Sequence, residues 1–461
     1  MGDDGVRDLR GALAAHGREG LLRFWDELDG AGRARLERDI RSLDLDLLDR
    51  LVETLVHGRE EHLDLDGVEP VEPDPAPSAE AVAEGEDALA RGAVAIVIVA
   101  GGQGTRLGFD GPKGCYPIGP VTDRSLFQIH CEKVAALGRR YGRTPPLYVM
   151  TSDDNHAATE AFFADHDRFG LERVRLFRQG TMPAVDAGSG AVLLAARDRV
   201  ALSPDGHGGT LRALRRNGCL DEMRERGVET IFYLQVDNPL IAVGDPGFVG
   251  AHRLAGAEVS SKVVRKTDPA EKVGVVAVRE GRQLVIEYSD LPDRLAELRR
   301  PGGGLAYAAG SIALHVFSRD FVERVAATAE LPYHRALKRV PYVGERGERV
   351  DPDEPNAIKF EQFIFDTLPL ARRSLVLETS REGEFEPLKN AEGPSSPETV
   401  RARLSDAAAG VLEAAGAVVS RTTDGAAAVP IELSPLVAAD PAELARRVPP
   451  GTVVDGPLTL S

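Results

Sequence analysis

Apolar positions follow two different periods along this chain. In residues 5–57 they recur three and four positions apart, as at Leu21, Phe24 and Leu28, which predicts amphipathic helices. We expect Trp25, the only tryptophan, to pack between these helices as a core residue. From residue 93 onward, short runs rich in valine and isoleucine alternate with helical patterns. This alternation is typical of βαβ units, so we predict an α/β fold with a doubly wound, mostly parallel sheet.

Changes in the spacing of the apolar residues predict the individual strands and helices. We expect strands at 93–99, 147–151, 174–177 and 230–236, and helices at 125–141, 155–167 and 210–226. After about residue 257 the pattern loosens, and residues 259–265, 273–278 and 284–288 predict strands of a more antiparallel lobe. We expect that lobe to cover the carboxyl edge of the sheet, where ligands of open α/β sheets bind.

Composition along the chain predicts three regions. Residues 58–80 are acidic and rich in proline, which indicates an extended linker. We therefore predict an N-terminal helical segment with its linker at 1–80 and a main α/β domain at 81–375. A small C-terminal α+β domain is expected at 376–461, with a helix at 397–415 and short strands.

The overall composition narrows the class of protein. Of 461 residues, 43% are hydrophobic and 28% charged, as in ordinary globular proteins. The formal net charge of −17 argues against nucleic acid as a partner, although a phosphate site can still be locally basic. Cys115, Cys131 and Cys219 lack metal-ligand or disulfide spacing. No apolar run could span a bilayer and the acidic N-terminus is unlike a signal peptide, so we expect a cytoplasmic protein with no membrane partner.

A glycine-rich segment follows the first predicted strand, where residues 99–116 read VAGGQGTRLGFDGPKGCY. Glycines let backbone N–H groups approach and face anionic oxygens, and Arg106 and Lys113 add positive charge. The spacing fits neither the G-x-G-x-x-G dinucleotide fingerprint nor the Walker loop. A strand that runs into such a loop predicts a nucleotide-binding site. The alternative is a glycine-rich turn with a chance lysine.

A second candidate group stands at the exit of the strand predicted at 230–236. Asp237 follows that strand, and the carboxyl ends of parallel strands meet along one edge of a sheet, so Asp237 and the glycine-rich loop share one crevice. A carboxylate there is suited to hold Mg²⁺ against phosphate oxygens. The alternative is that Asp237 closes the strand in an Asx turn.

Further motifs continue in order through the whole chain. They are QGTMPA at 179–184, PDGHGG at 204–209, KVVRK at 262–266, VGVV at 273–276, IEYSD at 286–290, PNAIKFE at 355–361 and PLKN at 387–390. With GGQGTRLG and PKG in the loop, this series resembles the UDP-N-acetylhexosamine pyrophosphorylases, a branch of the UTP:sugar-1-phosphate uridylyltransferases. The resemblance implies a Rossmann-like nucleotidyltransferase sheet of the glycosyltransferase-A type, with 81–375 as its catalytic domain.

The resemblance also implies a role for each matching residue. Ala100, Gly101, Gly102, Gly104 and Thr105 would contact the nucleotide, Gln179 would hydrogen-bond the uracil, and Gly206 would lie against the base. Arg106 and Lys113 would bind the triphosphate and act in catalysis with Lys389, and Asp237 would ligate Mg²⁺. Lys359 and Lys389 would neutralise phosphates of the two substrates, and Glu287 and Tyr288 would contact the sugar, with His207 and Ala308 also in the sugar site. Taken singly, Gln179 could merely cap a strand and the lysines could be solvated.

The implied reaction joins UTP and a sugar 1-phosphate into a UDP-sugar and pyrophosphate. The attacking phosphate oxygen is already an anion, so no general base is required, and catalysis rests on alignment and charge neutralisation. Mg²⁺ is the expected cofactor, and UTP and the sugar 1-phosphate are the expected partners. The sequence indicates no oligomeric state.

Two departures from the family pattern concern the sugar. The acetylhexosamine branch has Asn at the position of His207, and it has Asn-Ala-Gly-Asn where this chain reads AAGS at 308–311. Missing amides alter hydrogen-bond matching and therefore selectivity. N-acetylglucosamine 1-phosphate is the leading expected substrate, and glucose 1-phosphate or a broad specificity is the alternative. A non-catalytic nucleotide-binding scaffold is a further alternative, against which the retained charges of Arg106, Lys113, Asp237, Lys359 and Lys389 argue.

Overall fold

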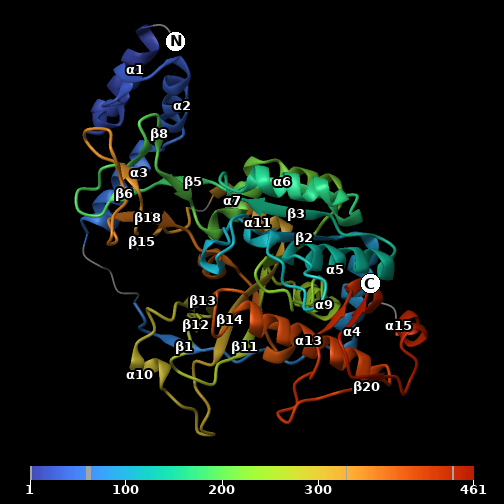
Figure 1. Ribbon diagram of the computed structural model, residues 1–461. Helices are drawn as coiled ribbons and strands as arrows, with labels where there is room; N and C mark the ends of the chain where they lie inside the picture. The colour runs from blue at the N-terminus through green and yellow to red at the C-terminus, as the bar shows by residue number, and fades with distance from the viewer. Residues whose placement is uncertain (1–2, 59–63, 329, 439–440) are drawn as a thin grey trace. The chain divides into compact units, whose positions relative to one another are not determined.

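The computed structural model of the chain describes residues 3–58, 64–328, 330–438 and 441–461 (Figure 1). Its contacts divide the chain into two compact units. Unit 1 comprises Met1–Asp64, Gly180–Gly209 and Glu330–Asp366, and unit 2 comprises Leu65–Gln179, Thr210–Ala329 and Thr367–Ser461. The boundaries at residues 80 and 375 stay a prediction. The contacts group the N-terminal helices with two later segments instead, because the three share one apolar core.

The first segment of unit 1 is helical, as the period of its apolar residues predicts. Its elements are α1 (Asp3–Ala15), the 3₁₀ turns η1 (Glu19–Leu22) and η2 (Trp25–Glu27), α2 (Gly30–Arg41), α3 (Leu45–Leu51) and the π-turn η3 (Val52–Val56). Asp29 begins α2, since its carboxylate accepts a hydrogen bond from the Gly32 N–H. Trp25 is 3% exposed and packs in one core with Ile358 and Phe360, which confirms it as a core residue.

The two later segments of unit 1 form short antiparallel strands. Their elements are β5 (Thr181–Pro183), β6 (Val185–Asp186), β7 (Leu194–Ala196), β8 (Arg199–Val200), β9 (Leu202–Pro204), η7 (His207–Gly209), β15 (His334–Lys338), β16 (Tyr342–Val343), β17 (Arg349–Val350) and β18 (Ala357–Glu361). β18 pairs with β15 on one side and β6 on the other, and Lys359 lies opposite Ala336. The β18–β6 pairing joins two segments of unit 1 that lie far apart in the sequence.

Unit 2 is built on one mixed sheet, to which ten of its described strands belong. Four parallel strands lie in the order β10 (Thr230–Gln235), β2 (Val94–Val99), β3 (Leu147–Thr151) and β4 (Val174–Arg178). Along the chain, β2, β3 and β4 advance in one direction and β10 returns to the other side of β2. The winding therefore reverses between β2 and β10, and ligands of open α/β sheets bind at such a switch point, beyond the carboxyl ends of the strands.

Antiparallel strands continue the sheet past β10. β14 (Ala309–Ser318) pairs with β10, and β11 (Val259–Arg265), β12 (Val275–Arg279), β13 (Arg282–Ile286), β19 (Ser374–Thr379) and β1 (Val68–Pro70) join beyond it. The antiparallel character predicted for the strands at 259–288 is confirmed, whereas β19 pairs with β11 in parallel. These strands join the side of the same sheet, through ladder hydrogen bonds such as those of the Tyr233–His315 pair, and their covering of the carboxyl edge stays a prediction.

Part of the predicted linker at 58–80 packs against unit 2. Residues 59–63 lie outside the described residues. After them, β1 pairs with β12, and the Asp74 N–H donates to Val376 O at 2.7 Å while its carboxylate accepts from the Val376 N–H at 2.9 Å. The segment is extended, as predicted, and it is held along the sheet by these backbone contacts.

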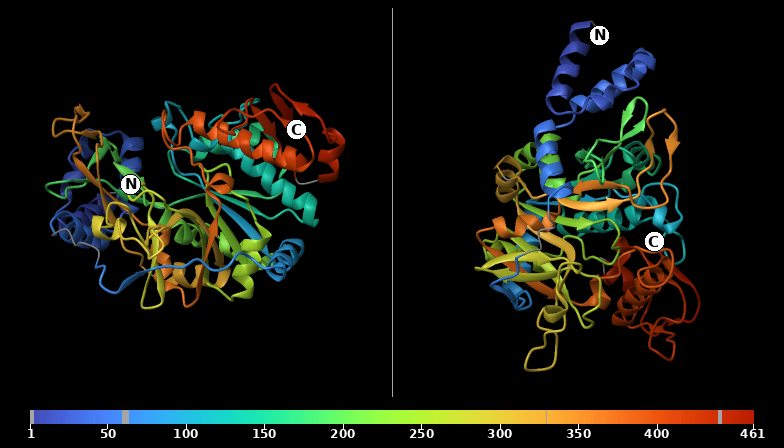
Figure 2. Two further views of the ribbon diagram at one scale, coloured as in Figure 1. Left: turned by 90° about the horizontal axis from the view of Figure 1, so that it is seen from below. Right: turned by 90° about the vertical axis from the view of Figure 1, so that its left-hand side faces the viewer.

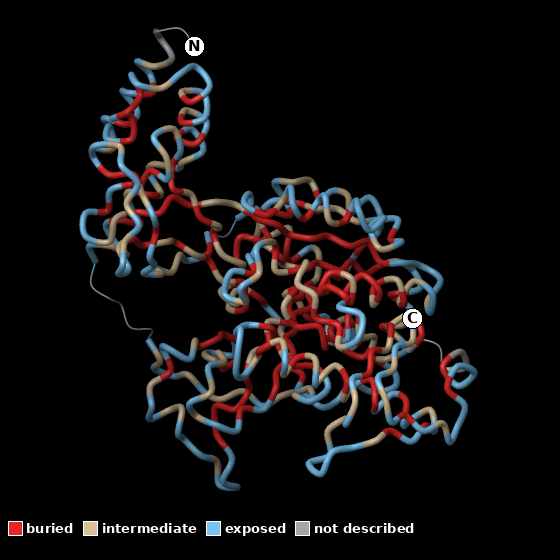
Figure 3. The backbone as a smooth tube through the Cα atoms, in the orientation of Figure 1, coloured by how far each residue is buried: buried red, intermediate tan, exposed pale blue. Residues whose placement is uncertain are grey.

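Helices cover both faces of the parallel strands, as in a doubly wound sheet. α4 (Ala79–Arg91), α5 (Leu126–Tyr141), α6 (His156–Asp165) and α9 (Pro246–Leu254) pack on one face, against Ile96 and Ile98. On the other face lie α7 (Thr210–Arg216), α8 (Cys219–Glu225) and α11 (Arg319–Thr328), with Phe317 stacked on Phe321 at 6.1 Å. The strands between these layers are buried (Figure 3), which explains why β2 reads as an unbroken apolar run.

The predicted elements of unit 2 match the structure within two residues at each end, with one exception. The helix predicted at 210–226 is broken into α7 and α8 at Gly218, which has φ 68°, a left-handed conformation that favours glycine. The strand predicted at 284–288 lies at Arg282–Ile286, so Glu287 and Tyr288 follow it in a turn. Across the described ranges, no helix has the length and apolarity needed to cross a membrane.

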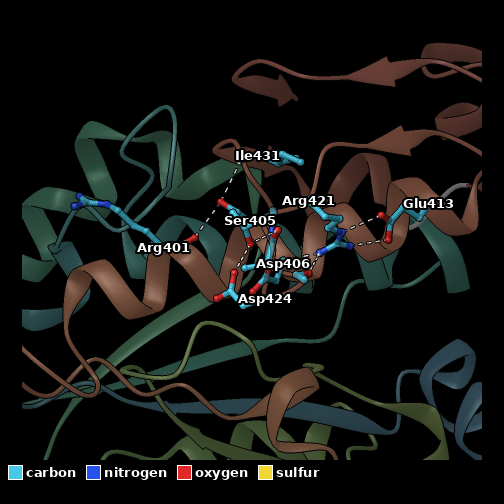
Figure 4. A network of polar contacts seen from close by, with 11 residues as sticks. Arg401, Ser405, Asp406, Glu413, Arg421, Asp424 and Ile431 are labelled. Carbon is cyan, nitrogen blue, oxygen red and sulfur yellow. Dashed lines mark hydrogen bonds and ion pairs between the residues drawn. The ribbon is translucent and has the colours of Figure 1, made fainter.

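The last part of unit 2 packs on α13 (Pro397–Ala414), beside the C-terminal strands in both views of Figure 2. Its other elements are β20 (Val418–Val419), β21 (Ile431–Leu433), α14 (Pro435–Ala438), α15 (Pro441–Arg447), β22 (Val453–Val454) and β23 (Leu458–Leu460). Figure 4 shows Arg421 bound to Glu413 and Asp406 of α13, while Ser405 accepts from the Ile431 N–H. These contacts fix the strands to the helix.

Short turns complete the described elements. They are η4 (Thr105–Leu107), η5 (Lys113–Cys115), η6 (Asp167–Gly170), α10 (Asp293–Ala296), η8 (Ile364–Leu370) and α12 (Arg381–Glu384). The turns η4 and η5 belong to the glycine-rich segment.

Candidate functional site

The glycine-rich segment leaves β2 and folds back on itself. The Gly104 N–H donates to Gly111 O at 2.9 Å, and the Lys113 N–H donates to Gly102 O at 3.1 Å. These two bonds bring Lys113 back beside the start of the loop, although eleven positions separate it from Gly102 in the sequence. Gly102 and Thr105 are exposed, whereas Ala100 and Gly104 are buried. The loop therefore stands at the carboxyl end of β2 with part of its backbone facing outward.

Asn155, just before α6, holds this loop to the next strand. It is 0% exposed, and its amide Nδ2 donates to Ala100 O at 2.9 Å and to Gly102 O at 3.2 Å. Its Oδ1 accepts from the Ser152 N–H at 2.9 Å. From its sequence position, Asn155 is expected only to begin a helix. A single polar residue between a predicted strand and a predicted helix could cap the helix or hold the neighbouring loop, and the sequence does not distinguish these two roles.

Gln179, at the end of β4, lies against the same loop. Its backbone N–H donates to Thr151 O at 2.9 Å, and its side-chain Oε1 would lie 2.1 Å from a Cβ built on Gly101. A side chain at 101 would therefore push this amide aside. Gln179 is 9% exposed, and no hydrogen bond from the described residues engages its amide group. The structure thus brings together Gln179 and Gly101, which the sequence assigns to one nucleotide site.

Lys113 and Asp237 meet at the switch point of the sheet. Asp237 follows β10, Lys113 follows the loop after β2, and Nζ lies 3.2 Å from Oδ2. The two side chains are 18% and 13% exposed, so their ion pair is only partly screened by water. This contact confirms that the two residues lie side by side, as expected from the neighbouring strand ends.

A second lysine acts on the same carboxylate. The Leu388 N–H donates to Asp237 O at 2.8 Å, which places the exposed Lys389 next to the aspartate. Burial alone would raise the pKa of Asp237, but the charges of Lys113 and Lys389 and the hydrogen bond from Lys113 outweigh it, so the pKa is lowered. Asp237 is therefore a carboxylate at neutral pH, held between two cations.

The side chains at this site are suited to bind a metal ion together with substrate phosphates. Among the described residues, no group of three or more histidine, cysteine, aspartate or glutamate side chains could enclose a metal ion. Asp237 supplies one ionised carboxylate instead. Mg²⁺ is commonly held by one or two carboxylates together with phosphate oxygens and water, so this residue fits the expected cofactor.

Arg106 extends the positive charge along the loop. It lies in η4, is exposed, and its guanidinium has no hydrogen bond or ion pair with any described residue. Gly104, the residue before η4, packs under the Phe109 ring, since a Cβ there would lie 2.7 Å from it. Arg106 is thus presented to solvent on a short turn whose backbone is fixed.

The predicted sugar residues of unit 2 form a separate group near β13 and β14. A Cβ on Gly274 would lie 3.2 Å from Glu287 Oε1, so the glutamate packs over this glycine, and Gly274 O accepts from the Ser311 N–H at 2.8 Å. Tyr288 is 48% exposed. Ala308 is buried and its carbonyl accepts from the Lys266 N–H at 2.7 Å. Glu287, Gly274 and Ser311 are therefore neighbours.

Three predicted site residues belong to unit 1. Gly206 has φ 84°, and a Cβ there would lie 2.3 Å from Gln362 O, so glycine is required. His207 Nδ1 accepts from the Ile364 N–H at 3.1 Å, and its ring lies 5.4 Å from that of Phe363. Lys359 is half-buried on β18. The roles assigned to these three residues stay predictions.

Comparison with known proteins identifies the family. Residues 45–394 match the family model described as UTP–glucose-1-phosphate uridylyltransferase. The chain belongs to this family. It is 41% identical over 348 residues to the UDP-N-acetylglucosamine pyrophosphorylase of Saccharomyces cerevisiae, covering 73% of each chain. It is 39% identical over 424 residues to the human UDP-N-acetylhexosamine pyrophosphorylase-like protein 1, covering 86% of this chain and 83% of the human one.

Solved structures agree with this assignment to the uridylyltransferase family. A UDP-N-acetylglucosamine pyrophosphorylase from Trypanosoma brucei, crystallised with an inhibitor, superposes with TM-score 0.79 at 26% identity over 98% of both chains. A protein from Entamoeba histolytica described as a UDP-N-acetylglucosamine pyrophosphorylase gives TM-score 0.78 at 31% identity over 86% of this chain and all of that one. The mixed sheet with its parallel segment is therefore the fold of UDP-sugar pyrophosphorylases.

Proposed function

We propose that this chain is a Mg²⁺-dependent uridylyltransferase that condenses UTP with N-acetylglucosamine 1-phosphate and releases pyrophosphate. The observation that carries the proposal is the Lys113–Asp237 ion pair at the switch point between β2 and β10, beside the glycine-rich loop and Lys389. Membership of the family and the identity to the yeast UDP-N-acetylglucosamine pyrophosphorylase support the reaction and the sugar.

The charged residues of unit 2 suit the transfer of a nucleotidyl group. Two polyanions must approach each other, and Lys113, Lys389 and Arg106 supply positive charge against their repulsion. Lys113 and Arg106 stand on the loop and would face the triphosphate, while Lys389 would face the attacking sugar phosphate. The attacking oxygen is already anionic, so no side chain has to remove a proton.

Gln179 is the proposed hydrogen-bonding partner of the uracil base. Its amide offers both a donor and an acceptor, which match N3–H and a carbonyl of uracil. It rests on Gly101 at the inner end of the loop, where the backbone can approach a flat ring. UTP should therefore be used in preference to CTP and ATP, since a polar site rejects bases that leave its groups unpaired.

Asp237 is the proposed protein ligand of Mg²⁺. When bound, the metal would neutralise charge on the phosphate oxygens of the nucleotide. The residue can serve because the two lysines keep it ionised. Replacing Asp237 by Asn removes the charge and keeps the size of the side chain.

The sugar is the finer part of the proposal. Glu287 and Tyr288 would bind the sugar hydroxyls, and His207 would replace the usual amide as a sugar partner. The methyl group of Ala308 offers no hydrogen bond where the family has an amide, which favours glucose 1-phosphate as the alternative substrate.

The test is pyrophosphate release from UTP with N-acetylglucosamine, glucose and galactose 1-phosphates in competition. We expect UDP-N-acetylglucosamine as the main product and its loss in the Lys113→Met and Asp237→Asn variants. The exposed Arg349–Asp351 ion pair provides the matched control, because Arg349→Met and Asp351→Asn break a pair of similar length on the surface. An excess of UDP-glucose would make glucose 1-phosphate the substrate. Absence of pyrophosphate release with every sugar would favour the non-catalytic scaffold.

A further inference from the structure

A buried glutamate lies behind the candidate site, at the end of α12. Glu384 is 8% exposed, and its Oε2 accepts from Lys262 Nζ at 2.7 Å and from Thr379 Oγ1 at 2.6 Å. Its Oε1 accepts from the Ala242 N–H at 3.0 Å. The sequence singles out Lys262 only as part of a motif and does not single out Glu384. The carboxylate is thus fully engaged at a place where no substrate role was expected.

These contacts reach both sides of the candidate site. Ala242 belongs to the loop that follows Asp237, and Asn238 of that loop donates from Nδ2 to Glu384 O at 2.7 Å. On the other side, the chain runs from Glu384 directly to Leu388, whose N–H binds Asp237 O at 2.8 Å, and to Lys389. Glu384 therefore joins the loop that carries the aspartate to the segment that carries the lysine.

The charge of Glu384 is balanced by a buried cation. Lys262 is 6% exposed on β11, and its Nζ also binds Asp245 Oδ2 at 2.7 Å. Asp245 in turn caps α9 through the Gly247 N–H. A buried ion pair adds little net stability, but removing one partner leaves the other charged and unpaired, so the arrangement is held in one geometry.

We infer that Glu384 is a positioning residue for the transfer reaction: it sets the distance between Asp237 and Lys389 by joining their two segments, with Lys262 as its counter-charge. This inference rests on the proposed function for its catalytic readout. Its carboxylate accepts from the Ala242 N–H and its backbone carbonyl from Asn238, while Leu388, four residues further along, binds Asp237 O. Loss of alignment slows reaction more than binding, because the phosphates still meet the same charges but at the wrong distance.

Two variants test the inference, one with a large and one with a small expected effect. Glu384→Gln leaves a single oxygen where the Ala242 N–H and Lys262 Nζ each use one carboxylate oxygen, and it removes the charge that Lys262 needs. Thr379→Val removes one hydrogen bond to the carboxylate and leaves both charges in place. Glu378→Gln is the matched control, because Glu378 pairs with Arg265 in an exposed ion pair on the same two strands.

Steady-state kinetics give the catalytic readout. We expect kcat to fall on the order of 100-fold in Glu384→Gln and about fivefold in Thr379→Val, with KM for UTP changed by less than about threefold. Glu378→Gln should match the wild type. A rise in KM at unchanged kcat, or wild-type kcat in both variants, would overturn the inference.

Hydrogen exchange in the ligand-free protein gives a readout that needs no activity. The amides of Ala242 and Leu388 should exchange faster in Glu384→Gln, and amides of unit 1 should not change. If the wild type proves inactive, the proposed function fails, and the exchange data alone decide whether Glu384 joins the two segments. Unchanged exchange at both amides would refute that role. If Glu384→Gln does not fold, Thr379→Val decides both readouts.

Discussion

Two buried histidines make the stability of unit 2 sensitive to mild acid. His130 on α5 and His252 on α9 are 0% and 2% exposed. His130 Nε2 donates to Val236 O at 3.0 Å, and His252 Nδ1 lies 2.8 Å from Ser260 Oγ. Burial lowers the pKa of each imidazole to about 3, and the charge of a neighbouring Lys133 or Arg253 acts in the same direction. Both rings are therefore neutral in the folded protein in mild acid.

The sign and size of the effect follow from proton binding. In the unfolded chain the two rings titrate near 6.5, so below that pH the unfolded state binds protons that the folded state does not. Stability is therefore lost as the pH falls from 6.5 towards the lowered pKa values. At about pH 5, protonation of the unfolded state costs the fold about 2 kcal/mol per histidine, or about 4 kcal/mol for the pair.

The assay compares the wild type with a double variant, His130→Gln and His252→Asn, whose amides reach the positions of Nε2 and Nδ1 without titrating. Urea unfolding is followed by far-UV circular dichroism at neutral pH and at about pH 5. Emission of Trp25, which lies in unit 1, is recorded in parallel and separates loss of unit 1 from loss of unit 2. We expect the wild type to lose about 4 kcal/mol more than the double variant between the two pH values. A difference below about 1 kcal/mol would refute the assignment of two neutral, buried rings.

Three further outcomes test other parts of the structure. Asn155→Ala leaves the Ser152 N–H and Ala100 O without their bonds, so we expect a loss of about 2–4 kcal/mol in urea unfolding, and a loss under 1 kcal/mol would contradict the clamp. Glu432→Ala removes the acceptor of the Val121 and Thr122 N–H groups, so hydrogen exchange of these two amides should accelerate; unchanged rates would show that the C-terminal strand does not hold that loop. Mg²⁺ alone should bind more weakly than about 1 mM, because Asp237 is its one carboxylate and already faces two lysines, and calorimetry with UTP present should show tighter binding. Submillimolar binding without nucleotide would contradict this.

The parallel half of unit 2 was predictable because its signals are local. β2 is buried on both faces, so its six residues form an apolar run that no amphipathic helix would show. The glycine-rich loop has its own composition, and Asp237 follows a strand whose central residues are apolar. The rule that strand ends of a parallel sheet meet at one edge then brings Lys113 and Asp237 together, and the 3.2 Å contact bears it out.

The antiparallel half of unit 2 was harder to predict, because the residues of a strand do not specify which other strands it pairs with. Residues 259–265 read correctly as a strand, yet nothing in them specifies that β14 and β19 lie on their two sides. Unit 1 shows the same limit. The apolar positions of β18 predict a buried face, but its packing against helices some three hundred residues earlier depends on long-range contacts.

The buried polar residues that hold segments together could not be predicted from the sequence, for a different reason. Asn155 binds backbone groups, which the sequence does not reveal, and Glu384 binds the Ala242 N–H together with Lys262 and Thr379, which lie on two different strands. His207 illustrates the reverse case. Its chemistry suggests a ligand role, whereas one of its nitrogens is used by the Ile364 N–H. A residue type therefore predicts what a side chain can do, and the neighbouring backbone decides how much of that capacity remains for a substrate.

Under the proposed function, the ion pair of Lys113 with Asp237 would let a chain with net charge −17 receive two anions. Before substrate binds, each charge is neutralised by the other, so neither the cation nor the carboxylate stands alone in a partly buried crevice. With substrates bound, Lys113 would turn to phosphate oxygens and Asp237 would hold the metal, so each charge would exchange one partner for another. The opposite charges then have to be neighbours. The need for adjacent opposite charges is a reason for the loop after β2 and the end of β10 to meet at the switch point.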